Sequence, residues 1–290
     1  MKHKVKTFAA GFIAVVASVM LAGCQSLQPP KHEIGQTFRG AFVFSSDNTA
    51  VPLPNEGAWI LVDFDQFHAL NSGRIKQAVL AQMDNGKLAR FVWASLQSLN
   101  TIGGWEDRKH CFGEADDEWV LHSDTDSYFR GDSLGEYDCW KMEVWSMQKW
   151  KDTPWNRTWN QSLDYYSNRN ISTGRSAAVA YFLQSAPRKF LRVAYGFNPQ
   201  VDGDLTDSQN TNWKKHRYYQ DKNRNEYIEE KKEWGEKWRH KVANGITGKL
   251  PVQPARSASD RISELQQLLD SGAITSEFYD KKKQEILDGL

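Results

Sequence analysis

Alternating apolar and polar positions in the first half of the chain predict a β-hairpin. Apolar side chains alternate with polar or smaller ones over residues 75–83 and again over residues 88–94. Asn85-Gly86 separates the two runs, and this dipeptide readily adopts the positive φ angles of a two-residue hairpin turn. We therefore predict two antiparallel strands joined at residues 85 and 86.

Further strands are indicated by shorter apolar runs between turn-forming residues. They lie at residues 40–44, 59–64, 119–122, 140–144, 177–183 and 190–197. The last run places Leu191, Val193, Tyr195 and Phe197 on one face. A short helix is expected near residues 155–168. Tight connections and few helices of crossover length favour a mainly antiparallel sheet.

A long charged helix is predicted from about residue 206 to residue 243. The segment is dense in Lys, Arg and Glu, holds no proline, and spaces Tyr227, Trp234 and Trp238 by seven and four residues. Asn244-Gly245 is a suitable C-terminal stop. We expect the single apolar stripe to pack across the sheet, so the predicted fold class is α+β.

The N-terminal segment is typical of an export signal. Lys2, Lys4 and Lys6 precede an apolar run from Phe8 to Ala22, which is too short to span a bilayer as a helix. Removal of residues 1–23 changes the formal charge from +1 to −2, because it takes away three lysines and no acidic residue. A near-neutral chain lacks the field that nonspecific nucleic-acid binding needs, so we expect no nucleic-acid partner.

Leu21-Ala22-Gly23-Cys24 resembles the lipobox of bacterial lipoproteins. The resemblance implies that Cys24 becomes the N-terminus and carries covalent fatty acyl chains such as palmitate, which bind the lipid bilayer. Gln25 and Ser26 then favour the outer membrane, facing the periplasm, under the sorting rule of enterobacteria-like lipoproteins. The alternative is an ordinary buried apolar segment with a packed cysteine.

The expected organisation after the signal has four parts. Residues 24–36 contain paired prolines and form a lipid-anchored tether, and residues 37–245 form the α+β domain. Residues 246–259 hold two prolines among small and polar neighbours and read as a linker. Residues 260–290 form a separate C-terminal module.

The C-terminal module resembles a SHOCT domain, a short two-helix element attached to many prokaryotic proteins. The resemblance is carried by Gly272, Thr275, Lys282, Lys283 and the apolar positions Ile262, Leu265, Leu268, Leu269, Ile274, Tyr279, Ile286 and Leu287. It implies an interaction or oligomerisation role, with a homo-oligomer or an envelope protein as the partner. Phe278 departs from the family pattern, which commonly has an acidic residue there, and adds one more apolar group to the candidate interaction set.

Two isolated helices of this size should not be stable. About eight buried apolar side chains contribute at most roughly 12–24 kcal/mol, whereas ordering 31 residues costs roughly 45 kcal/mol. The module must dock on its own domain, on another copy or on a partner.

Cysteine usage agrees with an exported protein. With Cys24 acylated, Cys111 and Cys139 remain, and an oxidising compartment favours a disulfide between them. The alternative is a zinc site that adds His110 and His122 as ligands, although the spacing fits no familiar zinc finger.

Catalytic and metal-binding motifs are weak. The polar stretch 110–132 suggests a carboxylate-dependent hydrolase, through His110, Glu114, Asp116, Asp117, His122, Asp124, Asp126 and Asp132. Asp221, Asn223 and Asn225 match three ligand positions of an EF-hand, but Glu226 and Lys232 occupy the glycine and glutamate positions, so a helix explains them better. We expect no catalytic residue, metal or cofactor apart from the lipid.

Five tryptophans fall within twenty residues, at positions 140, 145, 150, 155 and 159. Large rings commonly fill the core of a sheet, and we expect Trp140 there. Trp145, Trp150 and Trp155 are candidates for glycan contact, because an exposed indole stacks on sugar faces and the envelope is rich in glycans. The leading expectation is a noncatalytic scaffold or assembly lipoprotein that acts through its tail, and a glycan-binding module is the alternative.

Overall fold

The computed structural model describes residues 32–44, 47–54, 57–69, 73–98, 120–124, 138–202, 221–250 and 258–288. The chain divides into two units, residues 1–31 and residues 32–290. Every described residue belongs to the second unit.

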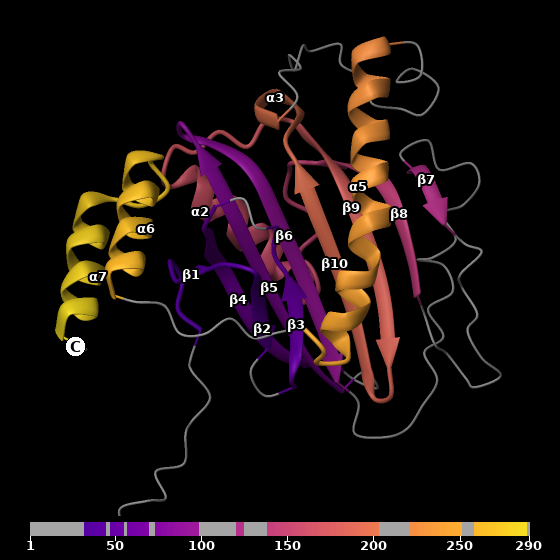
Figure 1. Ribbon diagram of the computed structural model, residues 1–290, viewed down its shortest axis with the longest axis horizontal. Helices are drawn as coiled ribbons and strands as arrows, with labels where there is room; N and C mark the ends of the chain where they lie inside the picture. The colour runs from indigo at the N-terminus through magenta and orange to yellow at the C-terminus, as the bar shows by residue number, and fades with distance from the viewer. Residues whose placement is uncertain are drawn as a thin grey trace, which may run out of the picture. The chain divides into compact units, whose positions relative to one another are not determined.

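Eight strands of the described residues form one antiparallel sheet in the order β1-β4-β5-β6-β10-β9-β8-β7 (Figure 1). Their bounds are β1 Thr37–Phe38, β4 Trp59–Ala69, β5 Gly73–Asp84, β6 Lys87–Ser98, β7 Val120–Asp124, β8 Asp138–Ser146, β9 Ser176–Ala186 and β10 Lys189–Phe197. A separate two-stranded sheet pairs β2, Ala41–Phe44, with β3, Thr49–Pro52. The predicted antiparallel sheet is confirmed.

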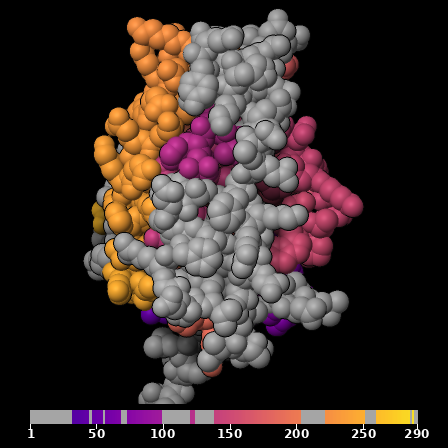
Figure 2. Space-filling model, turned by 90° about the vertical axis from the view of Figure 1, so that its right-hand side faces the viewer, coloured from indigo at the N-terminus to yellow at the C-terminus, as the bar shows by residue number. Residues whose placement is uncertain are grey.

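Helices and the small sheet cover the two faces of the large sheet. The helices are α2 Arg157–Ser167, α3 Pro199–Asp202, α5 Lys222–Ile246, α6 Ala258–Asp270 and α7 Ser276–Asp288. One core joins α5 and the β2-β3 sheet to one face, and a second core joins α2, α6 and α7 to the other. Figure 2 shows α5, in orange, at the surface of the molecule.

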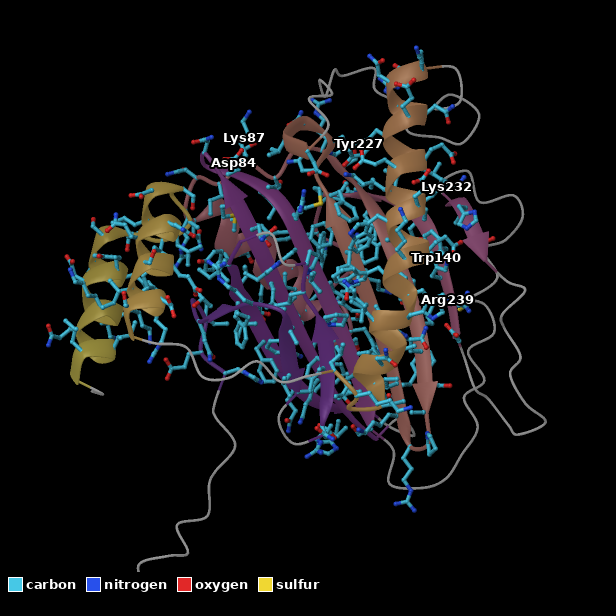
Figure 3. All side chains as sticks on the ribbon, viewed as in Figure 1. Asp84, Lys87, Trp140, Tyr227, Lys232 and Arg239 are labelled. Carbon is cyan, nitrogen blue, oxygen red and sulfur yellow. The ribbon has the colours of Figure 1, made fainter. Side chains whose placement is uncertain are left out.

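The predicted hairpin is the β5-β6 pair. Asn85 and Gly86 have φ angles of 48° and 74°, as the two-residue turn requires. Asp84 and Lys87 are paired in register at its tip (Figure 3). The predicted face of β10 is also confirmed, because Leu191, Val193, Tyr195 and Phe197 all lie in the core beneath α5.

The long helix differs from its prediction at both ends. It begins at Lys222 and not near residue 206, and residues 206–220 of the prediction lie outside the described residues. Asp221 caps the start of α5 by accepting hydrogen bonds from the backbone N–H groups of Asn223 (3.1 Å) and Arg224 (3.2 Å). The helix does not stop at Asn244-Gly245, but continues to Ile246, whose side chain is buried in the core. Ile246 and Ala258, which the predicted linker at residues 246–259 includes, are the last residue of α5 and the first residue of α6.

The described end of the predicted tether packs into the domain. The His32 ring lies 4.7 Å from the Phe42 ring and 4.9 Å from the Phe64 ring, and burial lowers the pKa of its imidazole. Gly35 N–H donates to the Leu61 carbonyl oxygen at 2.8 Å. The domain thus begins several residues before the predicted boundary at residue 37. Within the described part of the chain, no helix is both long and apolar enough to cross a membrane.

Candidate functional site

The five clustered tryptophans separate between the two faces of the sheet. Trp140 lies fully buried beneath α5, where its ring is parallel to that of Phe182 at 5.7 Å, so its predicted core position is confirmed (Figure 3). Trp159, on α2, is fully buried in the opposite core. Trp145, Trp150 and Trp155 are partly buried on the α2 side, and together they line a cavity.

This cavity, which we call the tryptophan cavity, has a volume of about 290 Å³. Its aromatic walls are Trp93, Trp145, Trp150, Trp155 and Tyr181. Its polar walls are Lys141, Glu143, Asn156 and Arg192. The structure therefore brings together all three tryptophans that were candidates for glycan contact.

Strand pairing places several residues of the tryptophan cavity next to one another in the sheet. Trp93, Ala194, Tyr181 and Lys141 form one row across β6, β10, β9 and β8, because Ala194 pairs with both Trp93 and Tyr181, and Tyr181 pairs with Lys141. Ala194 contributes only a methyl group between two large rings. Ala194 itself is fully buried in the core.

The indole walls are held in place by packing and hydrogen bonds. The Trp145 ring lies 5.0 Å from the Trp150 ring and 5.6 Å from the Trp159 ring, and Trp150 stacks on Trp159 at 5.2 Å. The backbone N–H of Trp150 donates to Asn160 Oδ1 at 2.9 Å, and Asn160 Nδ2 donates to the Trp150 carbonyl at 3.1 Å. A ligand would therefore meet a preformed surface, which lowers the ordering cost of binding.

Among the described residues that line the tryptophan cavity, Glu143 provides the one carboxylate, and both of its oxygens have partners. Lys141 Nζ lies 2.6 Å from Glu143 Oε2, and both side chains are largely buried. Trp145 Nε1 donates to Glu143 Oε1 at 2.7 Å. Arg192 adds a second positive charge, and its guanidinium lies 5.6 Å from the centre of the Trp155 ring. The cavity walls thus carry two cations and one anion.

Trp93 adds an unused hydrogen-bond donor to this region. Its side chain is 7% exposed, and its Nε1 atom is buried with no hydrogen-bond partner among the described residues. A buried donor without a partner costs about 1–3 kcal/mol. The wall of the tryptophan cavity therefore holds a polar group that an acceptor atom would stabilise.

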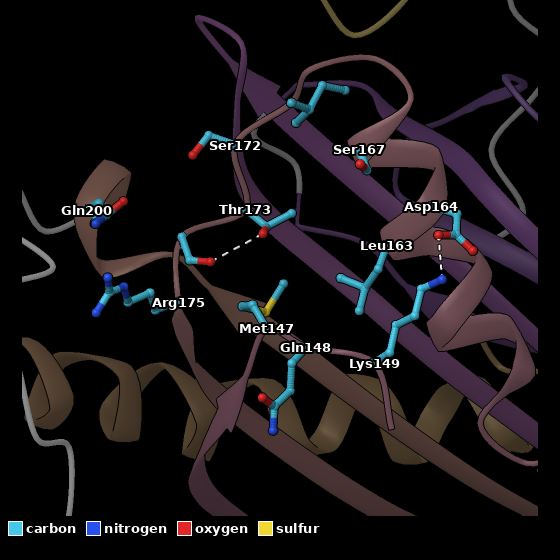
Figure 4. Close-up of a pocket in the computed structure, with 12 residues that line it drawn as sticks. Met147, Gln148, Lys149, Leu163, Asp164, Ser167, Ser172, Thr173, Arg175 and Gln200 are labelled. Carbon is cyan, nitrogen blue, oxygen red and sulfur yellow. Dashed lines mark hydrogen bonds and ion pairs between the residues drawn. The ribbon is translucent and has the colours of Figure 1, made fainter. Parts of the chain in front are cut away.

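A second, more polar cavity lies beside residues 147–149. It has a volume of about 660 Å³, and we call it the polar groove (Figure 4). Its walls come from residues 147–149, from the α2 side chains Leu163, Asp164 and Ser167, from residues 171–175, and from Gln200. Two of the lining residues, Lys149 and Asp164, form an ion pair at 2.6 Å.

The zinc alternative is wrong for His122 and Cys139. The His122 ring lies 4.9 Å from the Trp140 ring beneath α5, whereas Cys139 belongs to the core on the opposite face of the sheet. Cys139 is also disulfide-bonded, so its sulfur is not a thiolate ligand. Its predicted partner Cys111, like His110, lies outside the described residues, and the pairing stays a prediction.

The structure gives little support to the other candidates for metal binding or catalysis. Of the eight candidate residues in the polar stretch at residues 110–132, the structure describes His122 and Asp124, which are both on β7. The other six lie outside the described residues. The described residues contain no group of three His, Cys, Asp or Glu side chains placed to hold a metal ion. Asp221 caps a continuous helix, which is the interpretation we preferred over an EF-hand loop.

The C-terminal helix pair packs against its own domain. Glu264, 3% exposed, accepts hydrogen bonds from Arg39 Nε at 2.6 Å and Thr37 Oγ1 at 3.2 Å. Tyr165 on α2 donates to the Ala273 carbonyl at 3.3 Å, and the Gly86 N–H donates to the Ser271 carbonyl at 3.0 Å. Among the three docking possibilities, the structure shows contact with the parent domain.

Most apolar residues of the candidate interaction set are used in this packing. Leu265, Leu268, Ile274, Tyr279 and Ile286 are buried, Ile262, Leu269 and Phe278 are partly buried, and Leu287 is 43% exposed. The Phe278 ring lies against Gly35 so closely that a Cβ there would be 2.2 Å from it. Leu287 is the member of the set that remains open to a partner.

The sequence did not single out Trp93, Lys141, Glu143, Tyr181 or Arg192. These residues lie on β6, β8, β9 and β10, and the pairing of the strands in the sheet brings them together. The alternation in each strand indicated which face each residue would take. The order of the strands in the sheet was the missing information.

Comparisons with known proteins add no assignment. Scans against protein-family models, curated proteins and solved structures find no match.

Proposed function

We propose that this chain is a noncatalytic, lipid-anchored lipoprotein of the bacterial envelope that binds a glycan in the tryptophan cavity. The observation that carries the proposal is the convergence of Trp145, Trp150 and Trp155 with Trp93 and Tyr181 around one preformed space. Aromatic faces pack on the C–H faces of sugars, and a few polar groups at the rim orient the hydroxyls.

Charge favours a sugar over a cationic ligand. Aromatic cages also bind quaternary ammonium groups. Here Lys141 and Arg192 place two positive charges at the cavity, and the carboxylate of Glu143 already accepts from Lys141 and Trp145. A cation would be repelled, whereas a neutral polyhydroxylated ligand meets hydrogen-bonding groups of both kinds, including Asn156.

The same carboxylate count supports a binding role. Most glycoside hydrolases use a pair of carboxyl groups on either side of the scissile bond. Among the described residues that line the tryptophan cavity, Glu143 is the single carboxylate, and its oxygens are engaged.

Attachment to the membrane rests on the lipobox-like sequence at residues 21–24. We expect Cys24→Ser to release the protein from membranes into the periplasmic fraction. Retention of the Cys24→Ser protein in the membrane fraction would contradict lipid anchoring. It would leave the glycan site untouched, because the two features are separate.

The glycan site is tested with purified peptidoglycan sacculi and lipopolysaccharide as separate probes. The protein should bind one of them, and Trp155→Ala should weaken that binding at least tenfold. Trp234→Ala is the matched control, because Trp234 is also partly buried but packs on the α5 side of the sheet. Melting temperatures verify that both variants fold. Absence of binding to both probes, or equal loss in both variants, would reject the proposal.

Association through the tail is a second candidate. Leu287 is 43% exposed and Ile34 is 41% exposed, and they are the large apolar side chains that remain exposed among the described residues. Deletion of residues 258–290 should convert any dimer to a monomer, as measured by light scattering. An unchanged mass would argue against self-association through the tail.

A further inference from the structure

Neighbouring residues of one short segment line the tryptophan cavity and the polar groove. Trp145 and Trp150 line the cavity, and the residues between them, 147–149, line the groove. Hydrogen bonds with two other parts of the chain hold this segment in place. Trp159 Nε1 on α2 donates to the Gln148 carbonyl at 3.1 Å, and the Met147 N–H donates to the Arg175 carbonyl at 2.9 Å.

The polar groove is suited to sugar hydroxyls. Its walls present the amide groups of Gln148 and Gln200 and hydroxyl groups from Ser167, Ser172 and Thr173 (Figure 4). These groups both donate and accept hydrogen bonds. Lys149 and Asp164, which both line the groove, form an ion pair and neutralise each other's charge. Its volume of about 660 Å³ lies within the usual range of ligand sites, 300–1,000 Å³.

We infer that the polar groove is a second subsite of the same glycan site, and that the ligand is a linear glycan strand rather than a single sugar. One end of the strand occupies the tryptophan cavity, the strand crosses residues 147–149, and its next units lie in the polar groove. This inference rests on the proposed glycan site. It adds the length of the ligand, which that proposal leaves open.

Occupation of two subsites predicts affinity that rises with chain length. Once one sugar unit is bound, the linked units reach the second subsite at high effective concentration. The affinity of a longer chain therefore rises by more than its larger number of possible binding positions explains. A site that binds a dimer can bind any of about five overlapping pairs of adjacent sugars in a hexamer. This statistical effect alone would raise the affinity about fivefold. A gain of tenfold or more is the expected signature of both subsites acting together.

The experiment compares chitin dimers and hexamers by isothermal titration calorimetry. We expect the full domain to bind the hexamer at least tenfold more tightly than the dimer. Ser167→Phe places a ring in the polar groove and should bring the ratio down to about fivefold, with dimer affinity unchanged. Gln161→Phe is the control, because Gln161 is exposed on the same helix and lines neither cavity.

Two results would overturn the inference while the glycan site stands. One is dimer binding with a hexamer gain of fivefold or less, and the other is an unchanged hexamer preference in Ser167→Phe. Absence of binding to both chitin probes would also overturn the inference, and if sacculi and lipopolysaccharide failed to bind as well, the glycan site would be rejected with it.

Discussion

At the residue scale, Asp63 on β4 gives the fold a pH-dependent weakness. Burial raises the pKa of its carboxyl to about 7, with nearby Asp65 acting in the same direction. Its Oδ2 atom is buried and accepts no hydrogen bond from the described residues. The folded chain therefore keeps a proton between pH 3.8 and about 7 that the unfolded chain releases. The free energy of unfolding falls across this range as the pH rises.

Replacement of Asp63 by Asn should remove this effect. We expect Asp63→Asn to raise the free energy of unfolding by roughly 1–2 kcal/mol at pH 8, after allowance for partial solvent screening, and to change it little at pH 4. Thermal melts at both pH values measure this difference. Asp152→Asn is the control, because Asp152 is exposed and does not contribute to the raised pKa of Asp63. Equal shifts at the two pH values would contradict the account.

Gly235 illustrates a second residue-scale constraint, where packing outweighs helix propensity. A Cβ at this position would lie 2.5 Å from the Trp140 ring, which is 1% exposed and has no room to move. Alanine gains about 1 kcal/mol as a helix former, but overpacking costs about 1–3 kcal/mol. We expect Gly235→Ala to lower the melting temperature, whereas Lys237→Ala on the exposed side should leave it unchanged. A higher melting temperature for Gly235→Ala would show that α5 does not pack this closely.

At the scale of elements, Glu264 fastens the C-terminal helix pair to β1. Its carboxylate is almost fully buried and accepts from Arg39 and Thr37. We expect Glu264→Ala to increase amide hydrogen exchange throughout α6 and α7, by loss of about 1–3 kcal/mol of docking energy. Exchange in the central strands β5, β6 and β10 should stay slow. The exposed Glu277→Ala is the control, and equal exchange in the two variants would mean that Glu264 does not hold the pair.

The limits of prediction from sequence also become clear at the scale of elements. Asn85-Gly86 and the alternation around it predicted the β5-β6 hairpin, because turn geometry and side-chain facing are local properties. Both ends of α5 differ from the prediction, and at the C-terminal end Gly245 lies against the backbone of Ala50, a contact with another element. Such a contact outweighs the local preference of Asn-Gly for a helix end.

At the scale of the whole molecule, the two outer layers have different roles. On the α5 side, the large rings of Trp140, Tyr195 and Trp238 pack in one core. The α2 side holds the tryptophan cavity, where small Ala194 lies between Trp93 and Tyr181. The sequence indicated the tryptophans but not the cavity, because the residues that line it come from β6, β8, β9 and β10 as well as from the segment after β8.

The central claim is that the tryptophan cavity binds a glycan, and NMR of the indole N–H signals tests it most directly. On titration with soluble peptidoglycan fragments, and separately with lipopolysaccharide core oligosaccharide, we expect one probe to shift the signals of Trp93, Trp145 and Trp155. The signals of Trp59 and Trp238, buried elsewhere in the core, should stay fixed. Unchanged signals from the cavity tryptophans at saturating concentrations of both probes would contradict the account.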